Sequence, residues 1–445
     1  MLDFENQMIE LLFVVLHLFV FLTNLKLHGR NIFHPATLFS LVWLGVQGLH
    51  LLFGISILNK LYPMSIESLV LFLGGSILFS LGGFLINPPE KKAQGVFEQF
   101  KNEFTYSGQP LPRLLFTGIV FFGLPFYIWA TYQIFLSSQL DSFFVALRTE
   151  ISYNEQDIGP VKYLSSISSV CVAFNYYVSQ KEKNKINRIL LFISIFSNIG
   201  YSIFSTARTS ILILLTLILG VNIILRKKIK KKFLAIGFSL FFLVFMSIGL
   251  LYGKGGSVDE SISENLNSSA EYTGVYVVGG LNALDNQLKN NINPNYTGEL
   301  TLQFFSKIKK LMGIESGEKI KGLIQEFTFI PYATNVYTLY FPYLKDFGFF
   351  VTAFIIIFLG ALHTLVYEKG VLYGSFRYGM YFSFSLYPLF MSVFNEQYMT
   401  LLSTWIQTVF FIELFIRSDR IIQIFKNKAS QKNIIPSENQ IAKPE

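Results

Sequence analysis

Apolar runs long enough to cross a lipid bilayer recur along almost the whole of this 445-residue chain. The chain is 52% hydrophobic and only 14% charged, whereas a soluble domain carries about 25% charged residues. Because lipid offers no hydrogen-bond partners to the backbone, each run is predicted to form a helix. Eleven segments qualify, at residues 8–23, 36–56, 64–86, 114–137, 161–180, 189–206, 209–225, 233–252, 349–367, 379–395 and 400–416.

The Lys and Arg residues indicate how these helices are oriented, because short cytoplasmic connections are enriched in them. Most of the 36 basic residues fall in alternate connections and in the C-terminal tail, including the run from Arg226 to Lys232. This bias predicts an external N-terminus, a cytoplasmic C-terminus and an external segment at 253–346. The basic run is interpreted as a topology anchor beside anionic lipid, so no nucleic-acid partner is expected.

The predicted fold is an all-α polytopic membrane protein with about 11 transmembrane helices and one large external loop. Residues 1–252 hold eight helices and a short external interfacial segment at 138–160. Residues 253–346 form the external loop, residues 347–420 hold three more helices, and residues 421–445 form a cytoplasmic tail. Within the loop, residues 272–288 and 300–312 have helix-like apolar spacing, and residues 333–348 are expected at the membrane surface.

Two arginines on the predicted outer side suit an anionic ligand. Arg208 lies in Ser205-Thr-Ala-Arg-Thr-Ser210, where one apolar helix ends and the next begins. A helix N-terminus offers unpaired N–H groups and a positive dipole end, and a guanidinium adds a paired donor. Arg148, in the interfacial segment, is the second cation. Simpler interpretations stay open, since Arg208 can reach lipid phosphates and Arg148 can pair with Glu150 or Glu155.

Asn335, Tyr337, Thr338 and Asp346 cluster just before the apolar segment 349–367. Amide, phenol and hydroxyl groups suit sugar hydroxyls, and a carboxylate can accept the proton of an attacking hydroxyl. Asp346 can equally cap a helix, and the tyrosines of this stretch can belong to an interfacial aromatic belt. Both interpretations stay open.

The five histidines, at positions 17, 28, 34, 50 and 363, are scattered over membrane helices and one inner connection. None has a Cys or a carboxylate beside it at ligand spacing, so neither a metal site nor another cofactor is predicted. Cys171 is the only cysteine in the sequence, which excludes an intrachain disulfide.

Three stretches of this chain resemble the oligosaccharide repeat-unit polymerases, the Wzy type of O-antigen and capsule synthesis. They are Thr206-Ala-Arg-Thr-Ser-Ile-Leu212, Tyr276-Val-Val-Gly-Gly-Leu-Asn-Ala-Leu-Asp285, and the stretch from Ile330 to Gly348 with its Tyr-Ala-Thr-Asn-Val-Tyr-Thr and Lys-Asp-Phe-Gly. The third is the most specific of the three. The N-terminal third of the chain matches in hydropathy only.

The resemblance implies a metal-independent membrane glycosyltransferase of GT-C-like architecture. Such an enzyme joins repeat units carried on undecaprenyl pyrophosphate at the outer face of the bacterial inner membrane. Arg208 and Arg148 would then bind the departing pyrophosphate, Asp346 would act as general base, and Asn335, Tyr337 and Thr338 would bind sugars. The family also implies membrane lipids, a chain-length regulator and a flippase as partners.

Two alternatives remain, an O-antigen ligase and a lipid-linked oligosaccharide flippase or other transporter. Ligases resemble these polymerases in architecture but carry an outer-loop histidine, and residues 253–346 contain none. A transporter would be expected to place charged residues within its helices near the middle of the membrane. The predicted helices hold almost none apart from Glu67 and Glu413, near helix ends.

Overall fold

The computed structural model of this chain describes residues 2–57, 61–86, 106, 108–153, 156–205, 209–227, 232, 277–314, 327–330 and 333–432. The α-helices of this part of the chain include α1 (Leu2–Leu27), α2 (Pro35–Leu49), α3 (Ile66–Ile86), α5 (Pro110–Ser137), α6 (Phe143–Arg148), α7 (Tyr163–Lys181), α8 (Lys185–Phe204), α9 (Thr209–Ile224), α12 (Gln303–Leu311), α13 (Tyr340–Tyr367), α14 (Phe376–Met391) and α15 (Leu402–Lys432). Residues 277–289 are helical as well.

Short irregular turns extend four of these helices. They are the π-type turns η1 (His50–Ile57), η2 (Thr149–Tyr153) and η4 (Glu368–Leu372), and the 3-10 turn η3 (Gly159–Lys162). In the described part of the chain, the only strands are β1 (Thr328–Phe329) and β2 (Ala333–Thr334), which pair antiparallel with Phe329 opposite Ala333. A ladder of two residues per strand leaves the fold helical.

Six helical stretches among the described residues are long and apolar enough to cross a membrane. They are Phe4–Leu27, Pro35–Leu52, Ile66–Ile86, Pro110–Ser137, Lys185–Phe204 and Tyr340–Leu372, and Ser210–Ile224 is a shorter apolar helix. Predicted segments within the described residues lie on helices, while segment 233–252 lies outside them. The chain is therefore an all-α membrane protein, and the predicted total of eleven spans stays a prediction.

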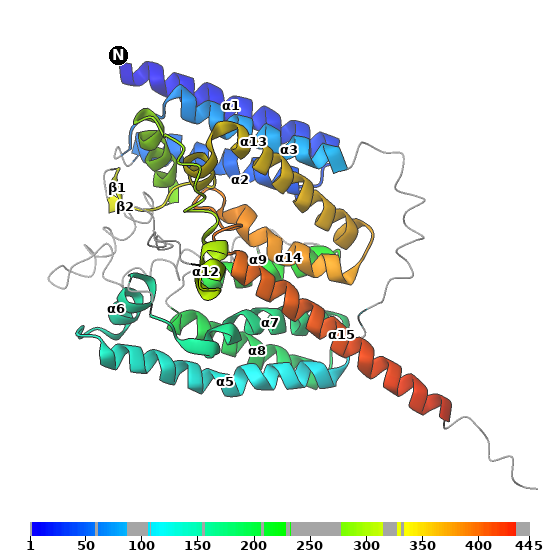
Figure 1. Cartoon of the computed structure of the whole chain (residues 1–445). Coiled ribbons are helices and arrows are strands. Elements are labelled where there is room, and N and C mark those ends of the chain that lie inside the picture. Colours follow the sequence, from blue (N-terminus) through cyan, green and yellow to red (C-terminus); the bar gives the residue numbers. More distant parts are fainter. Residues whose placement is uncertain are drawn as a thin grey trace, which may run out of the picture.

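Two groups of helices pack around separate cores (Figure 1). The helices α1, α2, α3 and α13 enclose one core, in which Trp43, Phe72 and Tyr340 are buried against one another. The helices α5, α7 and α8 enclose the other core, around Phe174 and Tyr201. The helices α9 and α14 pack together between the two groups, and α15 lies against α7.

Glycines allow α3 and α13 to approach backbone to backbone. A Cβ added at Gly82 would lie 1.9 Å from the carbonyl oxygen of Ile357, and one added at Gly360 would lie 2.0 Å from that of Phe79. Small residues at a helix crossing are the usual route to tight packing where lipid supplies no hydrophobic drive. This contact fixes the depth at which α13 sits beside α3.

The helix α13 begins at Tyr340, nine residues before the predicted apolar segment. The Tyr340 ring covers Gly75, which lies about 14 Å along α3 from its first residue. Residues around 340 therefore pack inside the bundle, and their predicted position at the membrane surface stays a prediction. Gly348, with a φ of 75°, interrupts the helix just after Asp346.

The two ends of the bundle differ in what they carry. At the end where α1 begins and α2 ends, here named the loop end, lie α6 and the β1–β2 pair (Figure 1). The connections rich in Lys and Arg lie together at the opposite end, where hydrogen bonds join them to neighbouring helices. These bonds are Asn31 to Tyr367, Arg226 to the Val371 carbonyl, Arg113 to Asn187, and the Gln109 N–H to Asp419. This one-ended gathering is what the alternating charge pattern predicts.

Candidate functional site

A buried carboxylate holds helical residues 277–289 against the start of α3. One oxygen of Asp285 accepts hydrogen bonds from the Ser65 N–H at 2.8 Å, the Ser65 hydroxyl at 2.5 Å and the Ser68 hydroxyl at 2.8 Å. The other oxygen lies 2.7 Å from Lys289 Nζ, one helical turn further on. Asp285 thus caps α3 from outside, as an aspartate at a helix N-terminus does.

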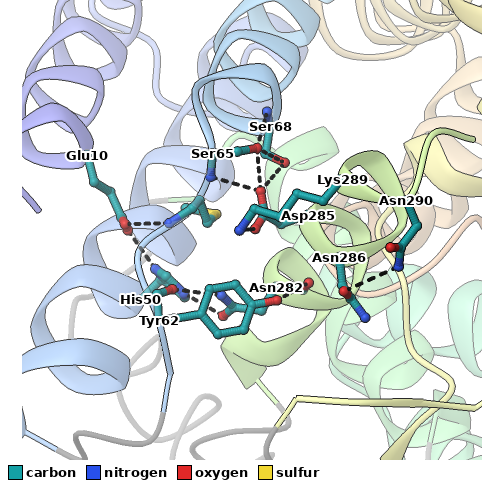
Figure 2. A network of polar contacts seen from close by, with 11 residues as sticks. Glu10, His50, Tyr62, Ser65, Ser68, Asn282, Asp285, Asn286, Lys289 and Asn290 are labelled. Carbon is teal, nitrogen blue, oxygen red and sulfur yellow. Dashed lines mark hydrogen bonds and ion pairs between the residues drawn. The ribbon is translucent and has the colours of Figure 1, made fainter. Parts of the chain in front are cut away.

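A second buried contact lies one turn earlier on the same helix. His50 Nδ1 is 2.6 Å from Glu10 Oε1, and His50 Nε2 is 2.6 Å from Asn282 Oδ1. The Asn282 amide donates to the Tyr62 carbonyl at 2.8 Å, and the Tyr62 hydroxyl donates to the Asn282 carbonyl at 3.2 Å. Figure 2 shows Glu10 on α1, His50 at the end of α2, Asn282 on helical residues 277–289 and Tyr62 in the connection before α3.

We name these eight residues the loop-end polar site: Glu10, His50, Tyr62, Ser65, Ser68, Asn282, Asp285 and Lys289. The Glu10, His50, Asn282 and Asp285 side chains are fully buried. Burial and the nearby Asp285 charge raise the pKa of Tyr62 to about 12, so its phenol stays protonated. Buried ionisable groups are costly in a membrane protein and mark functional positions more often than chance.

The exposed edge of the site is polar and carries one cation. Lys289 and Asn290 face solvent, and Asn286 is half-buried and donates to the Thr328 hydroxyl at 3.0 Å. The Lys289 ammonium also lies 4.7 Å from the centre of the Tyr62 ring. Amides and an ammonium group can bind hydroxyls and an anionic oxygen, which are the groups of a phosphorylated sugar.

The predicted general base, Asp346, is fully buried and heavily bonded. Its carboxylate accepts from the Thr301 N–H at 2.8 Å, from the Thr301 hydroxyl at 2.7 Å and from the Leu300 N–H at 3.1 Å. The residue therefore anchors the stretch before α12. These bonds hold residues 300 and 301 in place rather than capping a helix, and accepting a substrate proton at the bonded oxygen would first require Leu300 and Thr301 to move away.

The predicted sugar-binding residues lie in the core beside helical residues 277–289. Tyr337 is buried and stacks on Phe341 with ring centres 4.1 Å apart. Thr338 is fully buried, whereas Asn335 is half-buried. A Cβ added at Gly280 would lie 3.6 Å from the Val336 carbonyl oxygen, so the second and third stretches of the family resemblance pack on each other.

Of the two predicted arginines, Arg148 lies with the other helix group. Arg148 is half-buried at the end of α6, and Phe143 at the start of α6 packs against Phe204 at the end of α8. Arg208 lies outside the described residues, four positions after Phe204 in the sequence. The structure therefore brings the Arg148 segment to the end of α8, which precedes Arg208 in the sequence.

None of the eight residues of the loop-end polar site was predicted from the sequence as a site residue. Glu10 lies inside the predicted segment 8–23, in addition to the Glu67 and Glu413 noted above, and the structure buries it in α1. One signal for it exists: Glu10, His17 and Asn24 recur every seventh residue in an apolar helix, which puts them on one face. That face is buried, because His17 bonds Ser76 and Asn24 bonds Ser80.

Among the described residues, no three His, Cys, Asp or Glu side chains gather in a way that could hold a metal ion. In comparisons with known proteins, no family model, no curated protein and no solved structure matches this chain.

Proposed function

We propose that this protein polymerises oligosaccharide repeat units carried on a polyprenyl pyrophosphate, at the outer face of the bacterial inner membrane. One observation carries the proposal: the second and third stretches of the family resemblance, far apart in sequence, share one core. Val278 and Leu281, of the second stretch, lie in the same buried cluster as Tyr337 and Leu339, of the third stretch. Beside that core, the half-buried Asn286 and the exposed Lys289 and Asn290 form a polar edge at the end of helical residues 277–289.

The proposed reaction transfers a glycan chain between two lipid carriers. A hydroxyl of the incoming unit attacks the anomeric carbon of the growing chain, the bond from that carbon to the pyrophosphate oxygen breaks, and the lipid pyrophosphate leaves with the bonding electrons. Fixed cations stabilise the departing charge, and Arg148 and Arg208 are the proposed ones. The hydroxyl proton passes to a base, for which Asp346 remains the proposed residue once Leu300 and Thr301 release it.

The first test is gel analysis of surface glycan after deletion of the gene, with plasmid complementation as the control. A single-repeat-unit band in place of the polymer ladder supports a polymerase. Full-length polymer held on the lipid carrier, with none at the surface, would identify a ligase instead. An unchanged ladder would reject all the glycan functions considered.

The arginine roles are tested separately in the complemented strain. Arg208→Lys and Arg148→Lys keep the positive charge but lose the paired contact of a guanidinium with phosphate oxygens. We expect normal expression and loss of most polymer in each. Normal chain length in either variant would remove that arginine from the mechanism.

A second candidate function, transport of a lipid-linked oligosaccharide, is favoured by one specific observation. All five histidines of the chain lie in or beside α1, α2 and α13, and Glu10 pairs with one of them inside a candidate span. Buried carboxylate and imidazole groups are typical of ion-coupled transporters. In the deletion strain, unpolymerised units accumulating on the cytoplasmic face would favour this candidate over the polymerase.

A further inference from the structure

The Asn282 amide fixes where one proton of the loop-end polar site must lie. Its nitrogen donates to the Tyr62 carbonyl oxygen at 2.8 Å, so its own oxygen is the atom that faces His50 Nε2, 2.6 Å away. An amide oxygen only accepts hydrogen bonds. His50 Nε2 therefore carries a hydrogen.

The Glu10 contact requires one more proton. Glu10 Oε2 accepts from the Met64 N–H at 3.3 Å, and Oε1 lies 2.6 Å from His50 Nδ1. A carboxylate oxygen and a bare imidazole nitrogen would repel each other at that distance, so one hydrogen lies between them. Whichever atom holds it, the pair contains that single shared proton and has no net charge.

We propose that Glu10 and His50 form a proton-binding site, and that the proton they share holds helical residues 277–289 on the bundle. When that proton leaves for bulk solvent, the imidazole keeps one hydrogen for two acceptors. Either Nδ1 then faces the Glu10 carboxylate without a hydrogen, or Nε2 faces the Asn282 oxygen without one. All three side chains are fully buried, so water does not relieve the repulsion while the helix stays docked.

Asn282 cannot remove the conflict by turning its amide over. Its nitrogen would leave the Tyr62 carbonyl, and its oxygen would then face that carbonyl oxygen. The conflict is therefore relieved only when residue 282 moves away from His50. Docking of this helix and proton binding are linked, so each favours the other.

The charged and titratable groups around the pair come from every element that packs there. Tyr62 has a pKa raised to about 12, so it stays neutral across the range in question. Asp285 and Lys289 pair with each other one turn beyond Asn282 on the same helix, and Asp285 also accepts from the Ser65 N–H. The side chains of Glu5 on α1 and Glu67 on α3 are exposed at the surface of the protein, whereas Glu10 and His50 are buried.

The test is hydrogen exchange of residues 277–289, read by mass spectrometry on the full-length protein in lipid nanodiscs. After correction for intrinsic exchange, we expect the opening constant of this helix to be flat at low pH. It should then rise about tenfold per pH unit above the pH at which the open form loses the proton, and level off once the docked form loses it too, as one-proton linkage requires. A peptide from α13 provides the internal reference for global unfolding.

Glu10→Gln is the decisive variant, because a glutamine amide can donate to His50 Nδ1 and accept from Met64 without a proton shared between the two side chains. We expect a docked helix whose opening constant lacks the wild-type rise with pH. The matched control Glu67→Gln removes an exposed carboxylate from the same end of the bundle and should keep the wild-type pH profile.

Two results would overturn the proposal: a wild-type opening constant that is flat from pH 5 to pH 10, or a Glu10→Gln profile that matches the wild type. If Glu10→Gln does not fold, Asn282→Ala tests the same linkage by removing the partner of His50 on the docked helix. It removes the linked contact, so the helix should open more at low pH and lose its pH dependence. None of these readouts depends on glycan polymerisation.

Discussion

Asp346 shows how a single carboxylate can organise an otherwise irregular stretch of chain. It receives two backbone N–H groups and one hydroxyl from Leu300 and Thr301, which lie just before α12. A buried carboxylate with fewer donors would retain an unpaired charge, and a buried N–H without an acceptor costs about 1–3 kcal/mol. The contact therefore stabilises the position of α12 whether or not Asp346 also takes part in chemistry.

Two substitutions separate these roles. Thr301→Val removes the hydroxyl donor and leaves the carboxylate in place, whereas Asp346→Asn removes the charge. We expect both to lower the free energy of unfolding, by about 1 kcal/mol for the valine and about 2 kcal/mol for the asparagine. Thermal unfolding of each purified variant gives the stability, and the glycan ladder gives the activity. If Asp346 is the base, only Asp346→Asn abolishes polymer; a ladder retained in both makes it a structural anchor.

The histidines at the opposite end predict an acid-sensitive contact. His28 and His34 stack with ring centres 3.4 Å apart in the connection between α1 and α2. Burial lowers the pKa of His28 to about 4, and burial with the neighbouring His28 lowers that of His34 to about 3. The unfolded chain binds both protons below about pH 6.5 and the folded protein does not. Stability is thus fully present above pH 6.5 and falls as the pH drops toward 4 and then 3.

We expect this loss to be about 1.4 kcal/mol per pH unit for each histidine. His34→Phe keeps an aromatic ring beside His28 and Tyr367 but removes one titrating group. Unfolding midpoints measured in nanodiscs from pH 7 to pH 4 should therefore fall about half as steeply in this variant. Equal slopes in the two proteins would show that the acid sensitivity arises elsewhere.

At the scale of helices, the contact between α3 and α13 depends on having no side chain at two positions. Gly82→Ala would place a methyl group 1.9 Å from a backbone oxygen of α13, and Gly360→Ala would do the same against α3. Such overpacking costs about 1–3 kcal/mol or more, because the obstacle is backbone rather than a flexible side chain. Gly74→Ala is the matched control, since a Cβ there meets nothing within 4 Å.

We expect Gly82→Ala and Gly360→Ala to reduce the yield of monodisperse protein in size-exclusion chromatography and to lower its unfolding temperature. Gly74→Ala should match the wild type or exceed it slightly, because alanine favours a helix more than glycine does. Equal behaviour of the three variants would mean that α3 and α13 are not packed this closely in the membrane.

The helices themselves were predictable, because hydropathy alone decides which stretches can satisfy their backbone in lipid. The helices at 277–289 and at α12 followed from apolar spacing in the same way. The loop-end polar site was not predictable, since Glu10, His50 and Asn282 meet only through tertiary packing across 40 and 232 positions of sequence. A histidine in an apolar run gives no sign of its partner until the helices are placed.

For the whole molecule, the open question is which end of the bundle faces outward. The charge pattern and the gathering of basic connections at one end both predict that the loop end is external. Cysteine labelling tests this directly, because the only native cysteine, Cys171, is buried and can be replaced by alanine. In that background, Asn290→Cys marks the exposed edge of the loop end and Lys183→Cys marks the exposed connection at the opposite end.

We expect a membrane-impermeant maleimide to label Asn290→Cys in spheroplasts and to label Lys183→Cys only after the membrane is permeabilised. The Cys171→Ala parent should stay unlabelled in both conditions and should support a normal glycan ladder on complementation. The reverse pattern would place helical residues 277–289 in the cytoplasm. Repeat units could not then be joined by this loop on the outer face, so the proposed polymerase function would fail together with the predicted orientation.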